Sequence, residues 1–391
     1  MKPDLIIARY GEVGLKSNRV RKRFENRLKN NIKASIDADV KISQARIYIF
    51  PEDYGDAIEK LERIFGIVSY SPAISTKATF EDIEETVSLY AEKLHDEGLL
   101  DENTRFAISC RRVGTHEFSS QEMAGFAGAV VVRKYSAPVD LTNPELTIYL
   151  EVRDNDAYIF HEKIEGPGGL PLGTQGKVVS LVSSGIDSPV ATYLMMKRGC
   201  QVIALYCDNQ PYTTSDALKN YEDLVEQLNH YASGAPIKKR VVRYGDYLST
   251  CKSDAPDKMT CVLCKSGMYK IAGMLAKKMH AEAVIDGSSL GQVASQTLPN
   301  ILATREDLDV PVLSPLIGLD KVEITKIAQK IGTYDISKRD DGGCKAVPKY
   351  PETKADLELV KEIKEEIKDI SLESIDDKIM TIDDFLKDIE K

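Results

Sequence analysis

Long apolar segments are missing from this chain of 391 residues. No run of 18 or more apolar residues occurs, and the longest apolar stretch, residues 124–132, contains two glycines, so no membrane-spanning helix is expected. The N-terminus has no apolar signal region followed by a small-residue cleavage site. The seven cysteines are odd in number and widely spaced, which argues against a disulfide scaffold. These absences predict a cytoplasmic protein with reduced thiols and no membrane partner.

What is present is an ordinary globular composition with an uneven charge. Hydrophobic residues make up 42% and charged residues 29%, which excludes a collagen-like or wholly disordered chain, and the length predicts two or three domains. Residues 352–391 hold 14 acidic against 7 basic side chains, whereas residues 9–33 hold nine basic against two acidic. Local charge decides polyanion binding, so the net charge of -9 does not exclude nucleic acid as a partner.

Hydrophobic periodicity predicts two small α+β units in the first part of the chain. The first has strands at 4–10, 45–50 and near 68, and helices at 18–36 and 53–64. The second has helices at 80–95 and 119–135, and strands at 105–112, 146–152 and 157–160. The helix at 18–36 is apolar on one side and basic on the other, which places the positive charge on a solvent-facing surface.

A change of composition predicts the main boundary at residues 163–177, which contain five glycines and two prolines. Beyond it, strands at 178–182, 202–207, 240–244 and 283–286 alternate with helices ending at 198 and covering 215–231 and 266–280. This alternation predicts a parallel sheet covered by helices on both faces. We expect the acidic tail from Glu352 to be helical and solvent-facing, with an apolar stripe at Leu357, Val360, Ile363 and Ile367.

The loop at residues 183–188 joins the first strand of the parallel unit to its first helix. Ser188 is a suitable N-cap, Pro189 suits the first helical position and Gly199 supplies a stop. Free backbone N–H groups, the positive end of the helix dipole and three serine hydroxyls together predict a site for phosphate or pyrophosphate. The Gly-Lys pair of a Walker loop is missing here, because Gly176-Lys177 precedes the strand.

Two further stretches belong to the same predicted site or border it. Residues 286–297 follow a predicted strand and are rich in small hydroxyl and amide side chains, which suits close approach to a nucleotide at the carboxyl edge of a sheet. Asp320 and Glu323 are spaced as a capping box, and the start of a helix that ends at Gly332 explains both residues. Lys321 lies between them and stays a candidate for phosphate chemistry.

Taken together, these stretches resemble one family over residues 3–350. The Ser-Ser-Gly-Ile-Asp-Ser loop resembles the S-G-G-x-D-S signature of the PP-loop ATP pyrophosphatases, with Ser184 in place of a glycine. Residues 181–191, 287–297 and 315–324 resemble the tRNA 4-thiouridine synthetases (ThiI), and residues 106–112, 119–122 and 139–145 resemble the THUMP pattern. The resemblance implies an N-terminal ferredoxin-like domain at 1–75, a THUMP domain at 76–165, a PP-loop domain at 166–350 and an acidic helical tail at 351–391.

The resemblance also implies an activity: adenylation of O4 of a uridine, at position 8 of tRNA, followed by displacement of AMP by sulfur. A uracil oxygen is a very poor leaving group until it is attached to AMP. By similarity Asp187 supports the nucleotide chemistry through Mg²⁺, and Lys321 offsets charge on phosphate. The expected ATP-binding residues are Ser183, Ser184, Gly185, Ile186, Asp187, Ser188, Tyr206, Gly287, Ser288 and Gln296.

Three cysteines of the nucleotide domain raise the question of how sulfur enters. Cys261 and Cys264 form a C-x-x-C pair, Cys344 follows a Gly-Gly pair, and neighbouring lysines favour the thiolate. Many family members carry a rhodanese domain, which this sequence is expected to lack. Three readings stay open: an iron–sulfur cluster (4Fe-4S or 3Fe-4S) held by three cysteines with one iron exposed, a persulfide without metal, or structural zinc or no metal site.

The expected partners are tRNA, sulfide or a cysteine desulfurase as the sulfur source, and a second copy of the chain as a homodimer. Basic side chains of the first two units are candidates for phosphate contacts that recognise RNA shape. They are Arg19, Arg21, Lys22, Arg23, Arg27, Arg111, Arg112, Arg133 and Lys134.

Two alternatives to this function remain open from the residues. One is another PP-loop enzyme that adenylates a small metabolite, against which the basic N-terminal units argue. The other is a tRNA-binding protein with an inactive nucleotide site, which the Cβ of Ser184 would produce if the backbone there required a positive φ.

Overall fold

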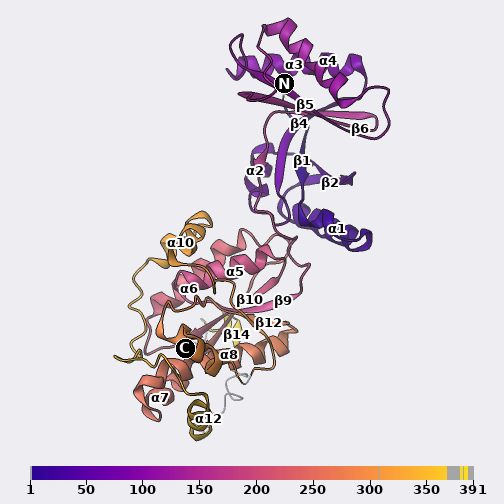
Figure 1. The fold of residues 1–391 in the computed structure, drawn as a ribbon. Coiled ribbons are helices and arrows are strands. Elements are labelled where there is room, and N and C mark those ends of the chain that lie inside the picture. The colour runs from indigo at the N-terminus through magenta and orange to yellow at the C-terminus, as the bar shows by residue number, and fades with distance from the viewer. Residues whose placement is uncertain (1, 307, 368–378, 382, 386–391) are drawn as a thin grey trace. The chain divides into compact units, whose positions relative to one another are not determined.

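The structure is a computed structural model, and it describes residues 2–306, 308–367, 379–381 and 383–385 (Figure 1). It divides into two compact units, Met1–Gly169 and Leu170–Lys391. The division falls inside the glycine- and proline-rich segment at 163–177 that marks the change of composition. Among the helices described, none is both long and apolar enough to cross a bilayer.

Unit 1 is built on one eight-stranded sheet with the order β2-β3-β1-β4-β7-β6-β5, and β8 pairs with β4. Its elements are β1 (Leu5–Arg9), η1 (Glu12–Leu15), α1 (Asn18–Ser35), β2 (Ala38–Ser43), β3 (Arg46–Pro51), α2 (Tyr54–Leu61), β4 (Ser69–Lys77), α3 (Phe80–Asp96), β5 (Phe106–Val113), α4 (Ser120–Tyr135), β6 (Leu146–Arg153), β7 (Asp156–Phe160) and β8 (Ile164–Glu165). The helical spacing in α1 buries Phe24, Leu28 and Ile32, as the periodicity predicts.

Strand β4 belongs to both halves of unit 1. Its first part, Ser69 to Ala73, pairs antiparallel with β1, and its last part, Ile74 to Lys77, pairs antiparallel with β7. Each half has its own core, one under α1 and α2 and one under α3 and α4. The predicted boundary between residues 75 and 76 therefore lies within a strand that the two halves share.

Unit 2 contains the predicted parallel sheet, in the order β13-β12-β9-β10-β11-β14. Its elements are β9 (Lys177–Leu181), α5 (Asp187–Lys197), β10 (Gln201–Asp208), α6 (Ser215–Asn229), β11 (Lys238–Arg243), α7 (Gly245–Ser253), η2 (Asp257–Met259), α8 (Thr260–Met279), β12 (Ala283–Ile285), η3 (Ala294–Gln296), α9 (Leu298–Arg305), β13 (Val312–Leu313), α10 (Lys321–Lys330), α11 (Tyr334–Ser337), α12 (Leu357–Glu366) and β14 (Met380–Thr381). All neighbours are parallel except β11 and β14. The chain leaves β9 toward β10 on one side and later returns to β12 on the other, so the crevice between β9 and β12 is the switch point where ligands bind in such sheets.

Helices cover both faces of this sheet, with α5, α6 and α10 on one side and α7, α8 and α12 on the other (Figure 1). The core on the α8 side joins Val179 and Leu205 of the sheet to Leu263 and Ile271 of α8.

Two expectations about the fold of unit 2 are wrong. The first concerns helix α8, which begins at Thr260 rather than at 266, so it includes the C-x-x-C pair, and α7 precedes it.

The acidic tail is the second correction to the expected fold. Its predicted helix forms as α12, but the apolar stripe does not face solvent, because Val360, Ile363 and Ile367 are buried in the core of unit 2. Residues Met380–Thr381 add the antiparallel edge strand β14 beside β11. The acidic charge of the described tail therefore lies on the outer side of an element that completes unit 2.

Candidate active site

The loop between β9 and α5 is fastened by serine hydroxyls. The backbone N–H of Ser183 donates to Ser188 Oγ at 2.9 Å, and Gly185 N–H donates to Ser183 Oγ at 3.4 Å. The helix begins at Asp187 with Ile186 at the N-cap position and no side-chain cap, so the expectation that Ser188 caps it is wrong. Ser188 instead closes the loop, and the first N–H groups of α5 remain directed at the loop mouth.

The residue that departs from the PP-loop signature creates no backbone conflict. Ser184 is not among the described non-glycine residues with positive φ. Its Cβ is therefore compatible with the loop, and the argument for an inactive nucleotide site loses its basis.

The second stretch packs directly against this loop. A Cβ built on Gly287 would lie 2.8 Å from Ser188 N and 3.0 Å from the carbonyl carbon of Asp187, so only glycine fits there. Gln292 Nε2 donates to Asp187 Oδ2 at 3.1 Å, and Lys321 Nζ lies 2.8 Å from Asp187 Oδ1. Residues separated by more than 100 positions along the chain thus meet at one carboxylate.

The capping box predicted before α10 is present. Glu323 N–H donates to Asp320 Oδ1 at 2.8 Å and Asp320 N–H donates to Glu323 Oε2 at 2.9 Å. Because this box fixes the start of α10, it also fixes the position of Lys321 at the first helical residue, facing Asp187.

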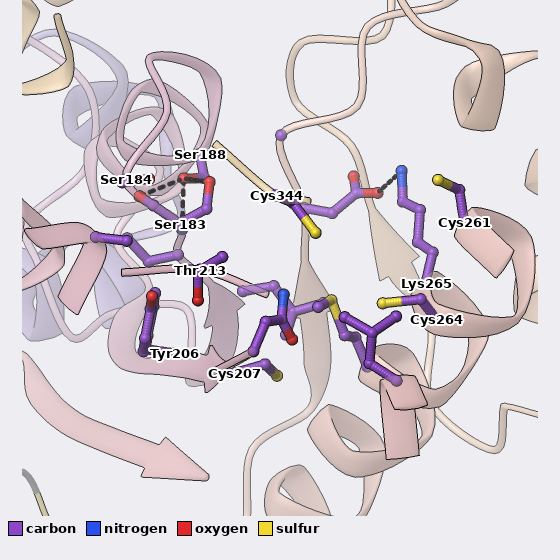
Figure 2. A pocket seen from close by; sticks show the side chains of 18 of the residues that line it. Ser183, Ser184, Ser188, Tyr206, Cys207, Thr213, Cys261, Cys264, Lys265 and Cys344 are labelled. Carbon is purple, nitrogen blue, oxygen red and sulfur yellow. Dashed lines mark hydrogen bonds and ion pairs between the residues drawn. The ribbon is translucent and has the colours of Figure 1, made fainter. Parts of the chain in front are cut away.

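A cavity of about 440 Å³ opens at the carboxyl ends of β9, β10 and β12. Figure 2 shows the serines of the loop on one side of it and Cys261, Cys264 and Lys265 of α8 on the other. Of the predicted site residues, those that line it are Ser183, Ser184, Asp187, Ser188, Tyr206, Gly287, Ser288, Gln296, Cys261, Cys264 and Cys344. Gly185, Ile186 and Lys321 are not among its lining residues.

Several residues of the cavity were not predicted as site residues. Cys207, Asn209 and Thr213 carried no signal, and they lie in the last part of β10 or in the segment after it. Lys265 and Asp286 also line the cavity, and the sequence marked only their surroundings, the C-x-x-C pair and the stretch 286–297. The side-chain oxygens Asn209 Oδ1 and Thr213 Oγ1 are buried without a hydrogen-bond partner in the structure. Such atoms are costly unless a ligand or water meets them, so they mark a polar wall of the binding site.

Lys265 and Asp286 form the charged part of the cavity wall. Lys265 Nζ donates to Ser288 Oγ at 2.9 Å and lies 3.9 Å from Asp286 Oδ2. Burial lowers the pKa of Lys265, and Asp286 acts in the opposite direction. Asp286 also accepts from Arg305 Nη2 at 3.0 Å and from Tyr269. Because α8 begins at Thr260, Lys265 lies on the same helix as the C-x-x-C pair, directly after Cys264, and this places it at the cavity.

The three candidate sulfur-carrying cysteines face the same cavity but differ in environment. Burial raises the pKa of Cys261 and raises that of Cys264 well above its ordinary value, so the predicted preference for thiolate does not hold for these two thiols. Cys344 is exposed. Within the described residues, no three His, Cys, Asp or Glu side chains are gathered closely enough to hold a metal ion. The thiols as arranged therefore do not form a ready cluster site.

The predicted RNA-contacting residues lie in unit 1 on separate elements. Five lie on α1, Arg111 and Arg112 lie in the last part of β5, and Arg133 and Lys134 lie in the last turn of α4. Arg133 pairs with Glu84 and Lys134 Nζ lies 2.9 Å from Glu92, so the charges on α4 are already balanced by α3. The structure does not gather the nine residues into one cluster.

Comparison with known proteins agrees with this architecture. The family described as ThiI, thiamine biosynthesis protein, matches residues 173–368, the ThiI ferredoxin-like domain matches residues 5–71 and the THUMP domain matches residues 77–162. The predicted fold class is thereby confirmed.

Relatives match over nearly the whole chain. A probable tRNA sulfurtransferase of Methanobrevibacter smithii is 66% identical, covering 93% of this chain and 95% of its own. Another, of Methanothermobacter thermautotrophicus, is 56% identical, with 93% and 94% covered. A crystal structure of a 4-thiouridine synthetase–RNA complex with bound ATP matches with a TM-score of 0.89 at 30% identity, covering 97% of this chain and 99% of that one. The chain therefore belongs to the ThiI family of tRNA sulfurtransferases.

Proposed function

We propose that this protein is an ATP-dependent tRNA sulfurtransferase that converts uridine at position 8 of tRNA into 4-thiouridine. One observation carries the proposal: a single cavity joins the anion-binding loop at Ser183–Ser188 to Cys261, Cys264 and Cys344. A site that both activates an oxygen and replaces it with sulfur needs the nucleotide and the sulfur carrier within reach of one base.

The first step is adenylation. O4 of the uridine attacks the α-phosphorus of ATP, the bond from that phosphorus to the β-phosphate oxygen breaks, and pyrophosphate leaves. The base gives up its N3 proton as the C4–O bond becomes single. The N–H groups at the start of α5 and the ammonium of Lys321 face the phosphates, where they stabilise the charge that builds up on the leaving pyrophosphate.

The predicted Mg²⁺ fits the residues at the loop. Mg²⁺ is usually bound through one or two carboxylates together with substrate phosphates rather than in a cage made of protein alone. Asp187 supplies one carboxylate at the mouth of the anion-binding loop, with its side chain 23% exposed. When bound there, the ion would neutralise phosphate charge, and Asp187 is the residue of this chain that would hold it.

The second step replaces AMP by sulfur. The terminal sulfur of a cysteine persulfide bonds to C4, the C4–O bond breaks, and AMP leaves with the oxygen. A second cysteine thiolate then attacks the inner sulfur, which releases 4-thiouridine and leaves a protein disulfide. Hydrosulfide attacks one sulfur of that disulfide, so that a new persulfide forms while the other cysteine leaves as a thiolate, and the cycle needs no further oxidant. We assign this step to the set Cys261, Cys264 and Cys344, and we route no step through an iron–sulfur cluster.

The decisive experiment uses anaerobically purified protein with ATP, Mg²⁺, sulfide and a tRNA transcript, and follows the absorbance band of 4-thiouridine. We expect signal with the unaltered transcript and none when uridine 8 is replaced. Asp187→Ala should abolish product, whereas Asp335→Ala, which removes a carboxylate 94% exposed on α11, should not. Thiolation by Asp187→Ala at the unaltered rate would refute the proposed chemistry.

The form of the sulfur carrier is tested separately. Iron and acid-labile sulfide in the anaerobic protein would support the predicted cluster, whereas the added mass of one sulfur atom on a peptide containing Cys261, Cys264 or Cys344 would support the persulfide. Cys344→Ser should abolish product formation and Cys110→Ser, a change in a cysteine of unit 1, should leave it intact. The cellular sulfur source, the homodimer and the cytoplasmic location remain predictions.

The small-metabolite alternative fits the chain less well. It leaves the whole of unit 1 without a role, although the 4-thiouridine synthetase solved in complex with RNA matches 97% of this chain. AMP formation that depends on tRNA rather than on a small acceptor would distinguish the two.

A further inference from the structure

Asp187 is held by two side chains of different kind. Lys321 Nζ lies 2.8 Å from Oδ1 and brings a full charge on a side chain that is 48% exposed. Gln292 Nε2 donates to Oδ2 at 3.1 Å and brings no charge. A neutral donor fixes the direction of a carboxylate and leaves its negative charge in place. A cation also fixes the direction, but it cancels that charge.

The loop that carries Gln292 is fixed at several points. Gly287 packs on the backbone of Ser188, and Ser289 Oγ donates to the carbonyl of Leu319 at 2.8 Å. Inside the loop, Gly291 N–H donates to the carbonyl of Gln296 at 3.0 Å, and Gly291 has a φ of 74° that suits glycine. Gln292 therefore reaches Asp187 from a loop tied both to α5 and to the segment before α10.

The other end of the amide has no partner. Gln292 Oε1 is buried and has no hydrogen-bond partner in the structure. A buried acceptor without a donor costs free energy, so this oxygen is suited to a donor that arrives with a ligand, such as a water bound to a metal ion.

We propose that Gln292 is a positioning residue that keeps Asp187 aimed at the magnesium ion of bound ATP while Lys321 is drawn to the phosphates. The inference rests on the proposed function, because it assumes that Mg²⁺–ATP occupies the loop. Lys321 is long and half-exposed, so it can exchange Asp187 for a phosphate oxygen, and Gln292 on its fixed loop then remains as the restraint on the carboxylate.

The test measures the Mg²⁺ concentration that half-saturates ATP binding, by titration calorimetry without tRNA. Gln292→Met keeps the length of the side chain and removes the donor, and we expect the half-saturating concentration to rise about tenfold, or about 1.4 kcal/mol. Gln329→Met, the same change on the exposed side of α10, should leave it unchanged. Unfolding midpoints should be equal for all three proteins, and Gln292→Leu replaces Gln292→Met if that variant does not fold.

A second background separates positioning from a merely structural role. In an Asp187→Asn protein, Gln292→Met should cause no further rise, because the carboxylate that it positions is gone. A tenfold effect in that background, or no effect in the unaltered one, would overturn the inference alone. Failure of the unaltered protein to bind ATP with Mg²⁺ would instead overturn the proposed function together with the inference.

Discussion

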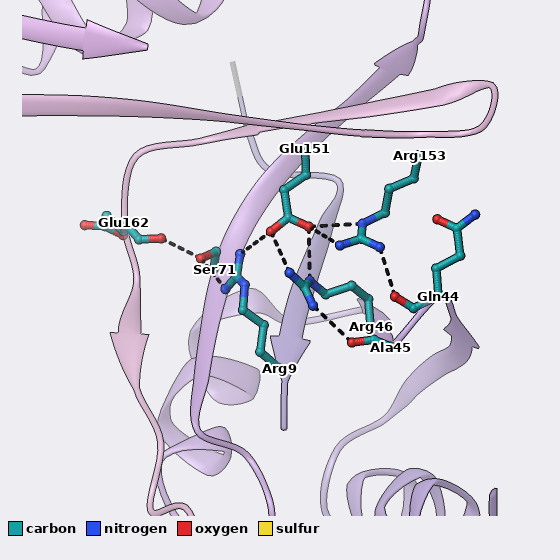
Figure 3. A network of polar contacts seen from close by, with 8 residues as sticks. All are labelled: Arg9, Gln44, Ala45, Arg46, Ser71, Glu151, Arg153 and Glu162. Atoms are coloured by element: carbon teal, nitrogen blue, oxygen red, sulfur yellow. Dashed lines mark hydrogen bonds and ion pairs between the residues drawn. The ribbon is translucent and has the colours of Figure 1, made fainter. Parts of the chain in front are cut away.

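Each unit contains a buried carboxylate that is surrounded by more positive charges than its own negative charge balances. The two carboxylates differ in what surrounds these clusters. In unit 1, Glu151 accepts from Arg9, Arg46 and Arg153 at nitrogen–oxygen distances of 2.8–3.4 Å (Figure 3). Burial would raise the pKa of Glu151, but the arginines lower it to about 2. Each arginine also donates to a further protein oxygen, namely Ser71 Oγ and the carbonyls of Ala45 and Gln44.

In unit 2, Asp286 gathers Lys265 and Arg305 in the same way, but the cluster opens on a cavity. Lys265 and Ser288 line that cavity together with Ser183, Ser184 and Ser188 of the loop between β9 and α5. Burial acts to raise the pKa of Asp286, yet Lys265 and the hydroxyl of Ser288 outweigh it and the pKa is lowered.

The comparison assigns different roles to the excess positive charge in the two clusters. Around Glu151 the guanidinium groups donate to oxygens of the protein, and the cluster joins β1 and β3 of one half to β6 of the other. Around Asp286 the excess faces a space large enough for a ligand. A cation matched only by protein acceptors is structural, and a cation that also faces a cavity is available to an anion.

Removing the carboxylate of unit 1 should have the largest effect. Glu151→Gln leaves buried Arg46 and Arg153 and half-buried Arg9 without a counter-charge, which should destabilise unit 1 by about 3–5 kcal/mol. Hydrogen exchange of β1, β4 and β6 amides in the full chain measures the destabilisation. Glu92→Gln, which breaks an exposed pair with Lys134, should have a much smaller effect, because solvent screens that pair. Equal effects of the two changes would break the comparison.

Removing the cation of unit 2 should change binding more than stability. Lys265→Met deletes a charged donor at the cavity wall, which should raise the dissociation constant of ATP by roughly 10–100-fold, while Asp286 keeps its bonds to Arg305, Ser288 and Ser314. Lys270→Met, on the exposed side of the same helix, serves as the matched control in the calorimeter. Reduced stability with unchanged affinity would assign Lys265 to structure instead.

The side-chain contacts of unit 2 also mark the limit of what local sequence patterns predict. The serine-rich loop between β9 and α5 and the capping box at Asp320 depend on neighbours in the chain, so spacing predicts that both form. The hydrogen bonds of Lys265 with Ser288 and of Gln292 with Asp187 join residues 23 and 105 positions apart, and no periodicity contains them. The expected exposure of Val360 is wrong for the same reason. The apolar stripe predicts a helix, but whether the stripe is buried depends on how the helix packs against the rest of the folded unit.

The acid sensitivity of unit 1 sharpens the comparison further. The pKa of Glu151 is about 2 in the folded protein, below its ordinary value of 4.5, so folding favours the ionised carboxylate. This stabilisation is present above the ordinary value and disappears as the pH falls toward 2. We expect the unfolding free energy of the unaltered protein to fall more steeply over that window than that of Glu151→Gln. Parallel pH profiles from urea titrations at successive pH values would contradict the assigned charge.

The smallest expected effect applies the same distinction to RNA binding. Arg133 and Lys134 are paired with Glu84 and Glu92. Helix α1 instead carries basic side chains along its length, and Glu25 is the one acidic residue within its bounds. The cations of α1 are therefore less fully neutralised by the protein than those of α4.

Replacing Arg21, Lys22 and Arg23 by Ala should weaken tRNA binding and reduce the slope of log affinity against log salt by roughly 0.7–0.9 for each phosphate that is no longer bound. Replacing Arg133 and Lys134 should change the slope by less than the amount expected for one phosphate, because their partners already neutralise them. Filter binding over a series of salt concentrations compares the two variants. A larger change for the α4 pair would mean that RNA displaces Glu84 and Glu92, and that pairing within the protein does not remove a cation from the binding surface.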